Sequence, residues 1–212
     1  MPLPRDTNLR QFLLFAFALI VPCFAIWTLL AGPIAMPVVG LTNLILQAWF
    51  PAVVDVMLFQ GSDTLLMTQF GELNGKPIPL DQAEFQLGFK VNPAILSYSL
   101  PFYATLHFAT QKEGYLGSFV NGVLILYPFI LLGMVCLSLK ELMINLGALF
   151  FEQPDTFVPN GNVIALLYQL NVLIIPTVAP IVVWAWQNRD TRLIRGVLNL
   201  PPLEEEEPER FI

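Results

Sequence analysis

NPAILSYSLPFYATLHFAT, residues 92–110, and GSFVNGVLILYPFILLGMVCLSL, residues 117–139, decide the fold of this chain. Neither stretch contains Asp, Glu, Lys or Arg, and only residues 111–116 separate them. About 20 apolar residues in a helix cross a hydrocarbon core about 30 Å thick. The two stretches therefore predict a pair of antiparallel membrane helices joined by a short loop.

The composition of the whole chain is typical of an integral membrane protein. Hydrophobic residues make up 56% of the 212 residues and charged residues 12%, against about 45–50% and about 25% in soluble domains. The net charge of -6 includes the acidic run 204–207, and the rest of the chain is near neutral. This balance argues against nucleic acid as a partner and leaves the lipid bilayer as the expected surroundings.

The N-terminal part predicts the first membrane span. Residues 1–10 are short and polar, and residues 11–31 carry no charge. A cleaved signal peptide is the alternative, because Arg5 and Arg10 precede an apolar run. We favour a retained helix, since the run is longer than the apolar part of a signal peptide and the sequence stays apolar after Ala31.

Residues 32–60 are the ambiguous segment. They are mainly apolar, yet they contain Asn43, Gln47, Asp55 and three prolines. Asn43 and Gln47 are four residues apart and would share one face of a helix. We expect an amphipathic helix that lies on the outer membrane surface, with a further crossing as the alternative.

The distribution of basic residues chooses between these alternatives, because the cytoplasmic ends of membrane helices are enriched in Lys and Arg. If residues 32–60 do not cross, four spans place both termini in the cytoplasm. The basic residues then divide into an inner group, Arg5, Arg10, Lys112, Arg189, Arg192 and Arg195, and an outer group, Lys76, Lys90 and Lys140. A further crossing would remove this asymmetry, so we predict four spans.

Residues 61–92 are expected to form a β-hairpin outside the membrane. Asp63–Glu72 and Glu84–Val91 alternate bulky apolar with polar residues, which is typical of strands. Between them, residues 73–82 contain Asn-Gly and two prolines, which favour turns. A pair of strands alone is marginally stable, so we expect it to pack on the outer helix.

The predicted fold is a mainly α integral membrane protein with four transmembrane helices and a small periplasmic layer of an amphipathic helix and a β-hairpin. The segments in order are the cytoplasmic N-terminus 1–10, span 11–31, outer helix 32–60, hairpin 61–92, span 93–110, span 117–139, periplasmic helix extension and loop 140–161, span 162–186 and cytoplasmic acidic tail 187–212.

No catalytic, metal or cofactor site is expected. His107 is the only histidine, and none of the four predicted spans contains an acid that could assist it. Cys23 and Cys136 lie in apolar runs without an activating base, so we interpret both as packing residues. Phosphate-loop and paired metal-ligand spacings do not occur. An intramembrane hydrolase would require Cys23 or His107 to be essential.

Each predicted span contains proline, which removes a backbone donor and bends or breaks a membrane helix. Such breaks build substrate sites in transporters, although proline is also common in membrane helices without this role. Gln169, Pro176 and Pro180 have the spacing of one helical face, which predicts a contact with another helix, either of a partner or of this protein's own bundle. The full set of predicted interaction residues is Asn92, Pro93, Tyr98, Pro101, Gln169, Asn171 and Pro176.

Four stretches carry a resemblance to a known family. They are PCFAIW at 22–27, LQAWFP at 46–51, FKVNPAILSYSLPFYATLHFAT at 89–110 and YQLNVLIIPTVAPIVVWAW at 168–186. In this order and spacing they resemble the exosortase H-associated membrane proteins of Gram-negative bacteria. The resemblance implies a companion of an exosortase, a polytopic transpeptidase-like enzyme that processes proteins with a C-terminal sorting signal in the inner membrane.

The resemblance does not bring a catalytic site with it. The sorting enzyme uses Cys, Arg and His, and the predicted spans of this chain contain no arginine. We therefore expect a non-enzymatic inner-membrane accessory protein that binds the exosortase-type transpeptidase or its sorted substrate. A subunit of a membrane transporter or channel complex is the alternative.

Overall fold

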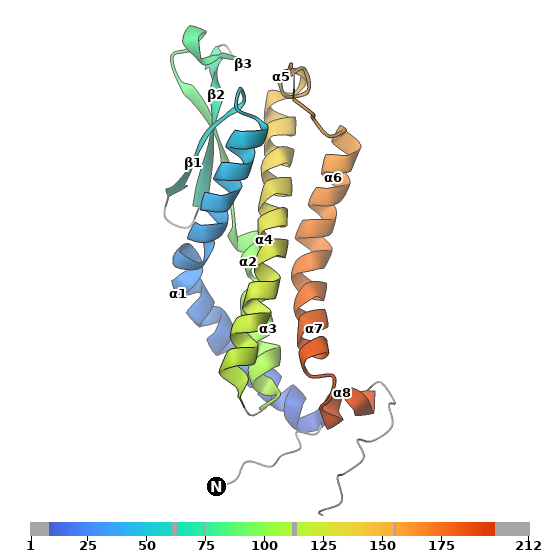
Figure 1. Ribbon diagram of the computed structural model, residues 1–212. Coiled ribbons are helices and arrows are strands. Elements are labelled where there is room, and N and C mark those ends of the chain that lie inside the picture. The colour runs from blue at the N-terminus through green and yellow to red at the C-terminus, as the bar shows by residue number, and fades with distance from the viewer. Residues whose placement is uncertain (1–8, 61–62, 74, 112–113, 155, 198–212) are drawn as a thin grey trace, which may run out of the picture.

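The computed structural model describes residues 9–60, 63–73, 75–111, 114–154 and 156–197. The expected N-terminal segment 1–10 and the acidic tail 187–212 lie largely outside the described residues. Helices run along the long axis of the molecule, and a small sheet flanks them at one end (Figure 1).

The helices and strands follow one another in a simple order. The helices are α1 (Leu9–Trp49), α2 (Ala94–Ser97), α3 (Ser99–Ala109), α4 (Tyr115–Leu146), α5 (Ala148–Phe151), α6 (Gly161–Gln169), α7 (Ile175–Gln187) and α8 (Arg192–Val197). A π-helix, η2 (Leu170–Ile174), joins α6 to α7, and a short 3-10 helix, η1 (Leu80–Gln82), precedes the last strand. The strands are β1 (Val54–Gln60), β2 (Asp63–Leu73), β3 (Lys76–Pro79) and β4 (Gln86–Val91).

Three helices of the described chain are long and apolar enough to cross a membrane. They are Leu9–Trp49, Tyr115–Leu146 and the continuous helix Gly161–Gln187. The predicted span 93–110 forms α2 and α3 instead, and their combined length of about 24 Å is less than a hydrocarbon core of about 30 Å. The crossing of α2 and α3, and with it the fourth span, stays a prediction.

The first helix is longer than the sequence predicted. Its 41 residues continue through Pro33 and Pro37, so the expected boundary at residue 32 is wrong. Each proline removes one backbone donor, and a helix that packs along its length bends there rather than ending. Figure 1 shows this change of direction in α1. Between the two prolines, the Ile34 carbonyl accepts a hydrogen bond of 2.9 Å from the hydroxyl of Tyr127 in α4.

Residues 32–60 therefore do not form a single surface helix, and this prediction is corrected. The helix ends at Trp49, just before Pro51, and the chain continues as β1. The segment VDVMLFQ contains β-branched and aromatic residues that favour a strand once a partner strand is available. That partner is β2, which pairs with β1 in antiparallel orientation.

The sheet is antiparallel, and β2 is its central strand. Leu65 of β2 pairs with Leu58 of β1 and with Lys90 of β4, so β1 and β4 lie on opposite edges. The far end of β2 pairs with β3 on the same edge as β1. The predicted alternation is present, because Thr64 and Leu66 are fully buried whereas the flanking residues are partly exposed.

One hydrophobic core joins the sheet to the helices. It contains Leu46 of α1, Leu66 of β2, Val91 of β4 and Leu142 of α4, each with at most 1% of its surface exposed. The sheet therefore packs on α1 and α4 and is not an isolated hairpin. Such packing is needed, because a pair of strands alone is only marginally stable. This packing also sets the direction in which β4 delivers the chain to α2.

Candidate interaction site at the helix breaks

The candidate site begins where the chain passes from strand to helix. β4 ends at Val91, and Asn92 accepts a hydrogen bond of 2.9 Å from the backbone N–H of Ala94 through its side-chain oxygen. Asparagine offers the backbone such a turn at the start of a helix. Pro93 follows and is buried. Both predicted residues therefore form the structural junction above the site.

The first helix break lies between α2 and α3. Pro101 has no N–H to offer the carbonyl of Ser97, four residues earlier, and α2 ends at Ser97. The Ser97 hydroxyl at this break accepts a hydrogen bond of 3.3 Å from Trp27 Nε1 of α1. Ser99 bonds back to the carbonyl of Leu96 at 3.0 Å. The break is thus held by local side chains and by α1.

The second break is the π-helix η2, immediately before Pro176. A π turn inserts one extra residue into a helix and is frequent at functional sites. Asn171 lies in this turn and is 1% exposed. Its amide nitrogen donates to the Leu167 carbonyl at 2.8 Å and lies 3.7 Å from Cys136 Sγ of α4. Among the residues that the structure describes, no hydrogen-bond partner reaches its oxygen, Oδ1.

The two breaks face each other. The hydroxyls of Tyr98, between α2 and α3, and Thr177, in α7, lie 3.2 Å apart. A cavity of about 10 Å³, lined by Ser99, Asn171 and Pro176 among others, lies between the breaks. This volume holds about one water molecule. A buried polar atom without a partner costs about 1–3 kcal/mol, so Asn171 Oδ1 is poised to accept a hydrogen bond from a donor that enters here.

The predicted common face of Gln169, Pro176 and Pro180 is wrong. Gln169 is exposed, whereas both prolines are buried. The π turn between them changes the angular position of every residue that follows, so the ordinary helical spacing does not hold across it. Gln169 therefore points away from the bundle, and in the described part of the chain its side chain makes no hydrogen bond.

The structure brings Tyr98, Asn171 and Pro176 together at the breaks and places Pro101 one turn into α3. The predicted interaction residues did not include the serines on either side of Tyr98, nor Thr177 and Trp27. The signal that was available is the spacing of Ser97 and Pro101, because a proline frees the carbonyl four residues before it. The contacts of Trp27 and Thr177 join distant segments and carry no local signal.

A second polar cluster holds the opposite ends of the helices. The Tyr103 hydroxyl lies 2.6 Å from Gln187 Oε1, and Gln187 Nε2 donates to the Ser118 carbonyl at 2.9 Å. His107 Nε2 is 2.8 Å from the Tyr115 carbonyl and therefore carries the proton. These contacts join α3, α4 and α7, and they place His107 in the packing between these helices.

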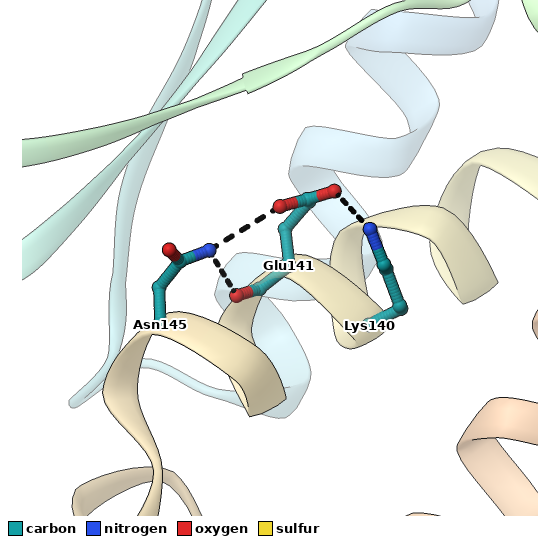
Figure 2. Close-up of polar contacts among 3 residues, drawn as sticks. All are labelled: Lys140, Glu141 and Asn145. Atoms are coloured by element: carbon teal, nitrogen blue, oxygen red, sulfur yellow. Dashed lines mark hydrogen bonds and ion pairs between the residues drawn. The ribbon is translucent and has the colours of Figure 1, made fainter.

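A charged group marks the end of the apolar part of α4. Lys140 Nζ lies 2.7 Å from Glu141 Oε1 and 5.2 Å from the ring centre of Tyr168 in α6. Asn145 donates to the carboxylate and to the backbone carbonyl of Glu141 (Figure 2). The preceding residues of α4, 115–139, carry no charge. The sheet lies at this charged end of the bundle (Figure 1).

The described residues contain no group of three or more His, Cys, Asp or Glu side chains that could hold a metal ion. Cys136 contacts the amide of Asn171 at 3.7 Å, and an amide does not activate a thiol. The arrangement at the breaks can accept and donate hydrogen bonds in an apolar setting.

Comparison with known proteins gives one match. A family model described as "Exosortase H-associated membrane protein" matches residues 6–191 of the chain. No curated protein matches, and no solved structure does. The matched range includes all the residues at the helix breaks and the whole sheet.

Proposed function

Because the chain belongs to the exosortase H-associated membrane protein family, we propose that it is a non-enzymatic accessory protein of a sorting system. It binds the exosortase-type enzyme or the sorted substrate of that enzyme. The binding surface includes the helix breaks, and the partner is a membrane helix that brings a hydrogen-bond donor. The chain itself contacts and positions its partner, while the enzyme catalyses the reaction.

The unpaired oxygen of Asn171 is the observation that carries this proposal. A donor from a neighbouring helix would pair with it, and such a bond contributes about 1 kcal/mol between membrane helices. Phe129, which also lines the cavity, is 40% exposed, so the cavity lies close to the surface of the bundle. The exposed amide of Gln169 offers a second polar contact on the outside of the same helix.

The proposed location is the bacterial inner membrane, with four spans and both termini in the cytoplasm. The charge-free part of α4, 115–139, supports a crossing, and α2–α3 would be the short span beside it. The start of α1, with Arg10, and α8, with Arg195, lie at the end of the bundle away from the sheet (Figure 1). Basic residues favour the cytoplasmic side, so the sheet would face the periplasm.

The surroundings of the reactive side chains support a role without catalysis. His107 contacts the Tyr115 carbonyl through Nε2 and lies 3.3 Å from the Tyr103 hydroxyl through Nδ1, and Cys136 contacts an amide. General base or nucleophilic catalysis requires an acid or base within hydrogen-bond reach of these groups. None of these contacts supplies a carboxylate or a second imidazole that could act as such a base.

A transporter or channel subunit is the second candidate, because two facing helix breaks resemble the substrate sites of transporters. The cavity between the breaks has room for about one water molecule. This size favours docking of a side chain over passage of a substrate. Cysteine labelling that finds position 171 inaccessible to water-soluble reagents would speak against transport.

The experiment that tests the accessory role is purification of the tagged chain from its native membrane in a mild detergent. Mass spectrometry then identifies the proteins that accompany it. We expect recovery of a polytopic cysteine transpeptidase or of a membrane-anchored sorting substrate. Recovery of the chain alone, as a stable homo-oligomer, would contradict the proposal and favour the transport subunit.

A further inference from the structure

The two edges of the sheet differ in how their backbone groups are satisfied. On the β1 edge, the N–H of Met57 donates to Asn43 Oδ1 of α1 at 2.8 Å. The carbonyl of Asp55 accepts from Gln47 Nε2, and the two amides of α1 bond to each other at 3.1 Å. Asn43 and Gln47 therefore cap this edge, which is one way in which proteins protect an edge strand from pairing with another chain.

The pairing of β2 shows which groups of β4 face outward. Met57 turns its N–H away from β2, so its neighbour Leu58 bonds to Leu65, and Thr64 and Leu66 bond toward β4. Their partners on β4 are Val91 and Phe89. The Leu87 carbonyl also points toward β2, as this alternation requires, because it accepts a hydrogen bond of 3.0 Å from the Thr68 hydroxyl of β2.

The backbone groups of Gly88 and Lys90 therefore point to the open side of β4. Both residues are exposed, and the Lys90 side chain is 67% exposed. In the sheet as described, β4 pairs with β2 alone. Asn43 and Gln47 form side-chain hydrogen bonds with the backbone of β1. No described side chain forms such a bond with the backbone of Gly88 or Lys90. The β1 edge is thus capped by side chains, and the β4 edge is open in this sense at Gly88 and Lys90.

The charges around the sheet show which strand would fit. The charged residues of the described chain between Asp55 and Glu152 comprise seven acids, Asp55, Asp63, Glu72, Asp81, Glu84, Glu141 and Glu152, and three lysines, Lys76, Lys90 and Lys140. Seven acids against three lysines leave this end with a net charge of -4. Two of the lysines are already paired, Lys90 with Asp63 and Lys140 with Glu141, each at 2.7 Å.

We propose that the open edge of β4, at Gly88 and Lys90, binds an extended basic segment of another protein by strand addition. An extended backbone repeats its donors and acceptors with the same two-residue period as the edge, and strand addition uses this match for affinity. The surplus of acids selects a segment rich in Lys or Arg. This site is separate from the helix breaks and does not depend on their role.

The first test uses purified full-length protein and a labelled peptide of about ten residues that alternates Lys and Val, a length typical of strands. A peptide that alternates Glu and Val is the matched control. Fluorescence anisotropy should give a dissociation constant at least about 10-fold lower for the basic peptide at low salt, since charge complementarity favours it. Equal affinity of the two peptides would overturn the proposal.

A pair of substitutions at one position separates the backbone from the side chain. Lys90→Pro removes the outward N–H, whereas Lys90→Ala keeps it and removes only the positive charge. The first should weaken binding of the basic peptide about 5-fold, the equivalent of one hydrogen bond. The second should leave binding unchanged or tighter, because a like charge is lost. Equal effects would overturn the proposal.

Hydrogen exchange of the unmodified protein provides a test that does not depend on the folding of a variant. The amides of Gly88 and Lys90 should exchange quickly alone and slowly with the basic peptide, while the Met57 amide should be protected in both states. Protection of Gly88 and Lys90 without peptide would overturn the proposal. So would a dimer in solution that Lys90→Pro dissociates, because a second copy would then occupy the edge.

Discussion

At the scale of single residues, the amides of this protein serve different purposes in similar apolar helices. Asn43 closes the edge of a sheet, with its oxygen 2.8 Å from the Met57 nitrogen. Asn171 has its nitrogen paired and its oxygen unpaired in a cavity. Gln169, two residues earlier, is exposed on the outside of the helix. The residue type is the same or similar, and the surroundings decide whether it supports the fold or is available to a partner.

The unpaired oxygen of Asn171 leads to a prediction for partner binding. Asn171→Leu removes a buried polar atom that costs about 1–3 kcal/mol in the free protein. We expect the thermal stability of the isolated chain in detergent to change little or to rise, while recovery of the partner in the purification falls several-fold. Asn121→Leu is the matched control, because it makes the same change on the exposed face of α4. Unchanged recovery with Asn171→Leu would contradict the docking role of the breaks.

The capping amides lead to a prediction for stability. Asn43→Leu leaves the Met57 N–H without its partner, which should reduce the free energy of unfolding by about 1–3 kcal/mol. Amide exchange at Met57 should become faster, whereas Leu41→Ala, at an exposed position of the same helix, should leave it unchanged. If Met57 exchanges at the same rate in both variants, the side-chain cap does not protect the edge.

At the scale of elements, the helices of this bundle are shaped by prolines in three ways. In α1 the helix continues through Pro33 and Pro37 and bends. At Pro101 the helix separates into α2 and α3, and before Pro176 it forms a π turn. A missing donor has the same chemistry at each site. The outcome depends on which neighbouring helix packs against the freed backbone.

The π turn leads to a prediction for the orientation of α6 and α7. In a Cys23→Ala background, Asn171→Cys should form a disulfide with Cys136 under mild oxidation, because the Asn171 amide lies 3.7 Å from Cys136 Sγ. Gln169→Cys should not, since that side chain is exposed on the other side. Alkylation of free thiols after oxidation distinguishes the two. Crosslinking from position 169 and none from 171 would show that the helix has a different register.

At the scale of the whole molecule, the charges divide the protein into two ends with an apolar length between them. Residues 115–139 of α4 and 156–188 around α6 and α7 carry no charge. The Lys140–Glu141 pair (Figure 2) and the sheet lie at one end, and α8, which carries Arg195, lies at the other (Figure 1). A bilayer around the middle satisfies this distribution, since charges inside a membrane are costly.

The proposed topology leads to a prediction for accessibility. In cells with a permeable outer membrane, a membrane-impermeant thiol reagent should label Lys76→Cys, which follows β2, at once. Tyr115→Cys, at the exposed start of α4, should be labelled only after the inner membrane is opened. This difference requires α2 and α3 to cross the membrane. Immediate labelling of both positions would show that they do not.

Several features could be predicted from the sequence because they depend on local patterns. Charge-free lengths predicted the three helices that are long and apolar enough to cross a membrane, since hydrocarbon excludes charge whatever the fold. The alternation in 63–72 and 84–91 predicted the two strands that pair as β2 and β4. The order of four apolar and aromatic stretches was enough to indicate the family, which the match over residues 6–191 shows.

Only the tertiary structure decided the features that depend on distant partners. The continuation of α1 past Pro33 depends on packing along α4, where Tyr127 reaches Ile34. The role of Asn43 depends on a strand 14 residues away, and the position of Asn171 depends on a π turn that places it against Cys136, 35 residues earlier. Helical periodicity describes neighbours within one regular element. It does not describe which second element will satisfy a polar group, because that choice belongs to the packing of the whole chain.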